Sequence, residues 1–180
     1  SDVYKRQKMN KLENSIPILE KRKLQAEIAK SIFEEMKLEL GITKAKKILK
    51  NAVIKNAINE GNQFRKKIDK KLPKDTTVID RFIEVFELWK TGGALEIKEL
   101  KKTNNQYNFD VTRCKYAEMY SEMGLEDIGQ LLSCNRDYNF SKGFDKNLKL
   151  DRKKTIMEGH SCCTFRSVSY THLRAHETRT

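Results

Sequence analysis

Apolar residues follow helical spacing through the first half of the chain and alternate with polar residues in much of the second half. From Ile16 to Leu40 they recur at steps of three and four residues, which predicts a helix with one apolar side. Gly41 is a natural end for this helix because glycine accepts the left-handed conformation. The residues expected on the apolar side are Ile16, Leu19, Leu24, Ile28, Ile32, Phe33, Met36 and Leu40.

Two more helices are expected before the Gly92-Gly93 pair. Thr43 can cap the second helix, whose apolar spacing continues to about Asp69 before Pro73. The third helix extends to about Lys90 after a cap from one of three residues, Asp75, Thr76 or Thr77. Its aromatic stripe could line a cofactor pocket, but this spacing favours core packing. The stripe consists of Ile79, Phe82, Ile83, Phe86 and Trp89.

Alternating positions after Gly92-Gly93 predict a small antiparallel sheet. Residues 95–101 and 107–113 read as a hairpin that turns at Asn104-Asn105. The other elements expected are short helices over 114–123 and 126–140, a strand over 148–157 and a last strand around Phe165. Helices followed by an antiparallel sheet predict an α+β fold. We expect one domain over 8–167, with a helical part (8–90) and a sheet-containing part (91–167).

Both ends of the chain resemble translated sequencing adaptor. Residues 1–7 read SDVYKRQ and residues 168–178 read VSYTHLRAHET, which the two adaptor DNA ends encode. We therefore expect residues 1–7 and 168–180 to be non-native and poorly packed. Setting them aside leaves His160 as the only native histidine. It also removes a zinc motif that the two tail histidines would otherwise complete with Cys162 and Cys163.

The net charge of +12 changes this picture little. The lysines are spread along helix faces, and no arginine-rich run or zinc-finger spacing accompanies them, so nucleic-acid binding is not expected. No apolar run approaches the roughly 20 residues that span a membrane, and no signal peptide is visible. Four cysteines without a C-x-x-C pair do not make a disulfide framework. We expect a cytoplasmic protein with reduced thiols that acts on a small molecule, and its oligomeric state is left open.

Cysteines and charged residues gather in the second half of the chain. Cys114 lies where a strand should pass into a helix, whose N-terminus can stabilise a thiolate. Cys134 opens a polar stretch that ends at Asp137, and Glu158 precedes Cys163 by five positions. A nucleophilic site, a metal site and cysteines that only pack are all compatible with this spacing.

Several blocks in this half resemble, in the same order, the signature of the L-2-amino-thiazoline-4-carboxylic acid hydrolase family. They read VTRCKYAEMYSEMGLEDIG, LLSCNRDYNFSKGF, LDRKKTIMEG and CTFR. The positions that match the family pattern are Cys114, Tyr116, Ala117, Glu118, Cys134, Asn135, Arg136, Asp137, Gly143, Phe144, Arg152, Thr155, Met157, Glu158, Gly159, Cys163, Phe165 and Arg166. The chain departs from the pattern at Cys162 and Thr164, where the family often has His and Asp.

The resemblance implies hydrolysis of 2-amino-thiazoline-4-carboxylate to N-carbamoyl-cysteine. This reaction needs a thiolate or an activated water, a proton donor for the leaving sulfur, and a cation for the carboxylate. The catalytic candidates are Cys114, Cys134, Asp137, Glu158 and Cys163. The substrate-binding candidates are Arg152, Arg166, Asn135 and Thr155.

A metal ion stays open as a cofactor. The alternative function is a non-catalytic module that senses a small ligand or a metal. Both functions predict that Cys114, Cys134, Asp137, Arg152, Glu158 and Cys163 gather around one pocket.

Overall fold

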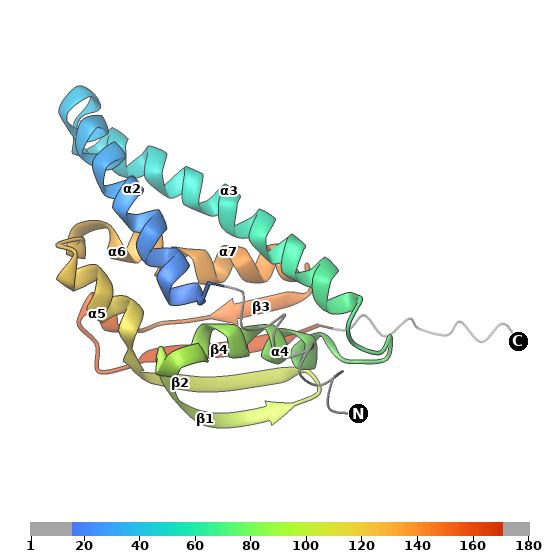
Figure 1. Cartoon of the computed structure of the whole chain (residues 1–180). Coiled ribbons are helices and arrows are strands. Elements are labelled where there is room, and N and C mark those ends of the chain that lie inside the picture. The colour runs from blue at the N-terminus through green and yellow to red at the C-terminus, as the bar shows by residue number, and fades with distance from the viewer. Residues whose placement is uncertain (1–15, 171–180) are drawn as a thin grey trace, which may run out of the picture.

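The structure, a computed structural model, describes residues 16–170 (Figure 1). The helices are α2 (Ile18–Leu40), α3 (Ile42–Asp69), α4 (Val78–Lys90), α5 (Lys115–Glu122), α6 (Glu126–Leu132) and α7 (Cys134–Phe144). The strands are β1 (Leu95–Thr103), β2 (Gln106–Cys114), β3 (Leu148–Asp151) and β4 (Cys163–Ser169). All strand pairs are antiparallel and the order is β1-β2-β4-β3, which confirms the α+β prediction.

Two predicted elements have different bounds. The single helix expected over 126–140 is two helices, α6 and α7, which meet at Ser133. The strand expected over 148–157 ends at Asp151, and residues Ile156–Glu158 form a 3-10 turn, η2. The Thr155 hydroxyl accepts a hydrogen bond from the Glu158 amide at 3.2 Å, which stabilises the turn in place of a strand.

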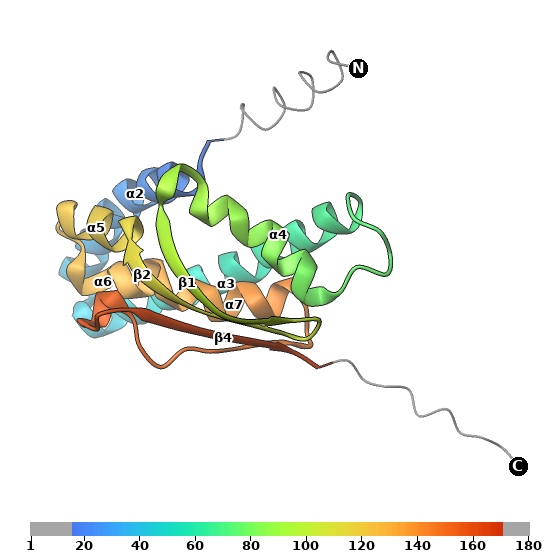
Figure 2. The same ribbon diagram turned by 90° about the horizontal axis from the view of Figure 1, so that it is seen from below.

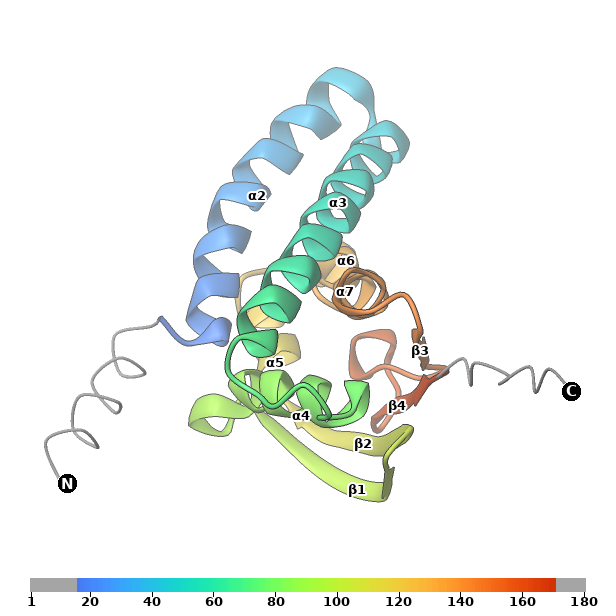
Figure 3. The same ribbon diagram turned by 90° about the vertical axis from the view of Figure 1, so that its right-hand side faces the viewer.

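Helices α2 and α3 form an antiparallel hairpin that projects beyond the sheet (Figures 1 and 3). The predicted apolar side of α2 is largely wrong. Its buried residues are Ile18, Arg22, Ala26 and Phe33. The expected residues that are exposed are Ile16, Leu24, Ile28, Ile32 and Leu40. Small residues define the seam with α3, because Ala26 and Ala45 are at most 1% exposed and let the two backbones approach closely.

Helices α3 and α7 cross at two glycines. A Cβ on Gly61 would lie 2.3 Å from the Phe140 carbonyl oxygen, and one on Gly143 would lie 2.0 Å from the Ile58 carbonyl oxygen. The helices therefore contact backbone to backbone, where only glycine fits. This crossing brings the Glu60 region of α3 beside the first turns of α7.

The helices cover one face of the sheet (Figure 2), and α7 packs beside β3. On β2, Tyr107, Phe109 and Val111 are at most 2% exposed, and the residues between them face the other side. Two core clusters result, one among the helices and one between α4, α7 and the sheet. The partly buried residues that pack against both clusters are Phe64, Trp89, Leu95 and Cys114.

The expectation of poor packing for the C-terminal end is wrong at its first two residues. Val168 pairs with Gln106 and with Lys149, and Ser169 is 4% exposed. Strand pairing uses backbone groups, so a residue that continues the register joins the sheet whatever its side chain. Tyr170 is 59% exposed. Residues 1–7 and 171–180 lie outside the described part of the chain.

Candidate functional site

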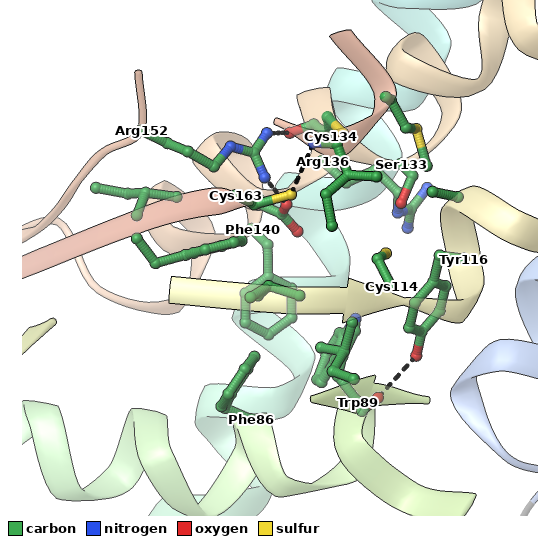
Figure 4. A pocket seen from close by; sticks show the side chains of 18 of the residues that line it. Phe86, Trp89, Cys114, Tyr116, Ser133, Cys134, Arg136, Phe140, Arg152 and Cys163 are labelled. Atoms are coloured by element: carbon green, nitrogen blue, oxygen red, sulfur yellow. Dashed lines mark hydrogen bonds and ion pairs between the residues drawn. The ribbon is translucent and has the colours of Figure 1, made fainter. Parts of the chain in front are cut away.

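A cavity of about 80 Å³ lies where the two core clusters meet (Figure 4). Its volume is several times the roughly 10–15 Å³ that one water molecule requires, so the cavity has room for more than a single water molecule. Phe82, Phe86 and Trp89 of α4 and Phe140 of α7 form an aromatic part of the lining. The Trp89 and Phe140 ring centres are 5.1 Å apart. The aromatic stripe predicted as core therefore packs the core and lines the cavity at once.

Three thiols line the same cavity from three separate elements. Cys114 ends β2, Cys134 begins α7 and Cys163 begins β4. Burial raises the pKa of Cys114 to about 11 and that of Cys134 to about 12. Burial also raises the pKa of Cys163, whose sulfur accepts a hydrogen bond from the Ile156 amide at 3.2 Å. All three thiols are therefore protonated at neutral pH.

The helix that follows Cys114 does not produce the thiolate expected there. Backbone hydrogen bonds at Ala117 and Tyr116 lower the pKa of Cys114, but the loss of water around the buried sulfur raises it by more. The thiolate that the sequence left possible at this position is therefore not favoured. The sequence places Cys114 before a helix but does not show how deeply its sulfur is buried.

Asp137 of α7 forms an ion pair with Arg152, which follows β3. Arg152 also donates to the Cys134 carbonyl, and its guanidinium lies 5.0 Å from the centre of the Phe165 ring. Only 2% of the Arg152 side chain is exposed, compared with 31% for Asp137, which faces the cavity. Burial raises the pKa of Asp137, while the charge of Arg152 opposes this shift. A carboxylate held in this way, with a raised pKa, is suited to proton transfer.

A second charged group on the cavity wall was not expected from the sequence. Arg22 of α2 and Arg136 of α7 both donate to Glu60 Oε2 of α3, at 2.6 and 2.7 Å. Burial would raise the pKa of Glu60, but the Arg22 and Arg136 charges outweigh it and lower this pKa to about 2. One feature of the sequence could have indicated this group. Arg22 lies between Ile18 and Ala26 on the buried side of α2, where a charged side chain needs a partner of opposite charge.

The structure brings five of the six residues expected around one pocket onto this wall, namely Cys114, Cys134, Asp137, Arg152 and Cys163. Glu158 is exposed and accepts hydrogen bonds from Gln130 and Thr155 instead.

Three of the proposed substrate-binding residues do not line the cavity: Asn135, Thr155 and Arg166. Thr155 is occupied in the η2 turn. Arg166 lies on the face of β4 opposite Phe165, because successive strand residues point to opposite faces, and it bonds to the Asp110 carboxylate at 2.8 Å.

An open groove of about 520 Å³ lies next to the cavity and contains His160. Four residues line both spaces: Cys114, Ala117, Ile156 and Met157. They lie where the cavity adjoins the groove. Within residues 16–170, no group of three or more His, Cys, Asp or Glu side chains is arranged to hold a metal ion. No described helix is both long and apolar enough to cross a membrane.

The fold and the site define an α+β protein with a small cavity that is lined by thiols, aromatic rings and paired charges. The sequence profile described as L-2-amino-thiazoline-4-carboxylic acid hydrolase matches residues 21–167. The chain therefore belongs to the L-2-amino-thiazoline-4-carboxylic acid hydrolase family, as the sequence blocks predicted. The matched segment includes all the charged residues of the cavity wall.

Other comparisons give weaker relations. Among curated proteins there is no match. Among solved structures, the phenol-responsive sensory domain of the transcription activator PoxR is 10% identical, with 77% of this chain and 71% of that chain covered and a TM-score of 0.48. An Fe(II) unliganded H-NOX protein mutant from K. algicida is 12% identical, with 67% and 64% covered and a TM-score of 0.34. Both TM-scores are below 0.5.

Proposed function

We propose that the protein is a hydrolase that opens a small ring containing sulfur and nitrogen, of the type of 2-amino-thiazoline-4-carboxylate, to a carbamoyl thiol. One observation carries the proposal: the Asp137 carboxylate faces the cavity while a buried arginine holds it in place. Membership of the hydrolase family agrees with this chemistry. The free thiols suit a reducing compartment, so we propose the cytoplasm as the location.

Water, rather than a cysteine, is the proposed nucleophile. The raised pKa values of the three thiols leave little thiolate at neutral pH. In the proposed reaction the water oxygen bonds to the ring carbon that joins nitrogen and sulfur. Asp137 takes one proton from the water and passes it to the ring nitrogen. The carbon–sulfur bond then breaks as the carbonyl forms, and the remaining hydroxyl proton passes through Asp137 to the sulfur.

The other cavity residues have supporting roles in this proposal. Arg152 positions Asp137 through the ion pair and the Cys134 carbonyl. The thiols of Cys114, Cys134 and Cys163 form a polarizable wall around the ring. The aromatic side chains exclude bulk water, which strengthens the electrostatic interactions inside the cavity.

The test is to incubate the protein with 2-amino-thiazoline-4-carboxylate and to detect N-carbamoyl-cysteine by mass spectrometry. We expect Asp137→Asn to lower the rate by roughly 10²- to 10⁴-fold, as for loss of a general acid–base group. Asp151→Asn is the matched control, because Asp151 is exposed and lies outside the cavity lining. Melting curves of both variants check the fold. Similar rates for Asp137→Asn and wild type would exclude the acid–base role.

The cysteine roles need a separate set of variants. We expect Cys134→Ser to keep measurable turnover, because a wall residue tolerates a similar side chain, whereas loss of a nucleophile removes turnover. Cys162→Ser is the control, since Cys162 is outside the cavity lining. Complete loss of turnover in a folded Cys134→Ser protein would restore the thiol mechanism.

A protein that binds the ring without opening it is the second candidate function. The aromatic lining of the cavity favours it, because aromatic side chains suit recognition of a small ring. Saturable binding without any N-carbamoyl-cysteine would select this function.

A further inference from the structure

The cavity wall carries more positive than negative charge. Arg22, Arg136 and Arg152 line it, against the carboxylates of Glu60 and Asp137. Arg152 is matched by Asp137. Arg22 and Arg136 share Glu60, and even the same Oε2 atom. One buried guanidinium therefore has no carboxylate of its own, which is costly unless an anion completes the pair.

Arg136 also has an unused hydrogen-bond donor. Its Nη2 atom donates to Asn56 Oδ1 at 2.8 Å and to Glu60 Oε2 at 2.7 Å. Its Nε atom is buried and has no hydrogen-bond partner among residues 16–170. The side chain is 10% exposed and belongs to the cavity lining (Figure 4). A buried guanidinium N–H that has no hydrogen-bond partner is unfavourable, and an oxygen atom of a ligand can accept a hydrogen bond from it.

We propose that Arg136 and Arg22 form a carboxylate-binding site in the cavity, which holds a small cyclic acid with its ring against Trp89 and Phe140. The proposal rests on the proposed function in treating this cavity as the substrate site. It divides the arginines into two roles. Arg136 and Arg22 bind the anionic group, and Arg152 remains with Asp137 as its positioning residue. Arg166, the other sequence candidate for the carboxylate, lies outside the cavity lining.

Benzoate and benzamide test the charge preference independently of thiazoline chemistry, because the two molecules have nearly the same shape. Trp89 is the single tryptophan and lines the cavity, so its fluorescence reports binding. We expect wild type to bind benzoate at least about tenfold more tightly than benzamide, the fold-change that corresponds to a charge-assisted hydrogen bond. This comparison needs no variant and does not depend on the folding of one.

Arg136→Gln tests the residue itself. We expect it to weaken benzoate binding by roughly 10- to 100-fold and to leave benzamide binding nearly unchanged. Arg113→Gln is the control, because Arg113 is exposed and also loses one charge. Equal affinity of wild type for both probes, or no saturable benzoate binding, overturns the proposal. Equal benzoate affinity in Arg136→Gln and wild type overturns it too.

The outcomes also separate this proposal from the proposed function. Charge-dependent binding at Arg136 without N-carbamoyl-cysteine formation supports the carboxylate site and contradicts the hydrolase. Turnover of 2-amino-thiazoline-4-carboxylate that is indifferent to Arg136→Gln supports the hydrolase and contradicts the carboxylate site.

Discussion

The buried Glu60 cluster should make the stability of this protein depend on pH in a specific way. The pKa of Glu60 falls from 4.5 to about 2 in the folded protein, because Arg22 and Arg136 stabilise the carboxylate against the effect of burial. A carboxyl with a lowered folded pKa stabilises the fold above its unfolded pKa and loses that contribution as the pH falls toward its folded pKa. The sensitive window therefore lies between about pH 5 and pH 2.

The magnitude follows from the shift in pKa. Each unit corresponds to about 1.4 kcal/mol, so Glu60 contributes about 3 kcal/mol to the free energy of unfolding at neutral pH. About 2 kcal/mol of this is lost between pH 6 and pH 3 by linkage. Glu60 is 8% exposed, so solvent screening reduces the contribution little.

Urea denaturation of wild type and Glu60→Gln from pH 7 to pH 3 measures this contribution. We expect the stability difference between the two proteins to shrink by about 2 kcal/mol as the pH falls, because glutamine has no proton to gain. Glu27→Gln, an exposed change on α2, should follow the wild-type curve. A constant difference between wild type and Glu60→Gln across this range would refute the reasoning.

Three further predictions concern packing, reactivity and access. Gly143→Ala should destabilise the fold by about 1–3 kcal/mol or more, because the new Cβ would lie 2.0 Å from the Ile58 carbonyl oxygen. Chemical denaturation measures this loss, and Lys142→Ala at an exposed position is the control. Iodoacetamide at pH 7.5 should alkylate Cys162 at least about a hundredfold faster than Cys134, whose pKa is raised to about 12; comparable rates by peptide mass spectrometry would contradict the buried thiol. Met157→Ala should speed the association of benzoate severalfold, because Met157 lies where the cavity adjoins the outer groove and the smaller side chain leaves a wider passage. Stopped-flow measurement of Trp89 fluorescence gives the association rate. An unchanged rate would show that benzoate enters the cavity by another route.

Local periodicity in the sequence determined the class and order of the elements. Steps of three and four residues predicted α2, α3 and α4, and alternation after Gly92-Gly93 predicted β1 and β2. Individual residues at the helix termini also determine where α2 ends and where α4 begins. Gly41 has a positive φ of 78° at the end of α2, and the Thr77 hydroxyl accepts from the Asp80 amide at the start of α4. Thr77 was one of three candidate caps in the sequence. The cap expected at Thr43 is wrong, because Gly41 precedes α3 and Thr43 lies inside this helix.

Part of the candidate site could also be predicted from the sequence alone. The family blocks pointed to Cys114, Cys134, Asp137, Arg152 and Cys163, and these residues share one wall. Their catalytic roles stay predictions. What the blocks could not show is the ionisation of the thiols, because a thiol's pKa depends on how much water the fold removes from around it.

The tertiary structure alone decided which side of each element faces the interior. Leu24 and Ile28 are exposed while Arg22 and Ala26 are buried, because α3 packs on α2 through small residues and charged pairs. Likewise Arg152 turns inward to Asp137 and Arg166 turns away, although the sequence treats both as equal candidates. The carboxylate of Glu60 meets Arg136 only because glycines let α3 and α7 cross closely. Burial and charge pairing depend on contacts between segments that are far apart in the sequence. The local spacing of apolar residues does not reveal these contacts.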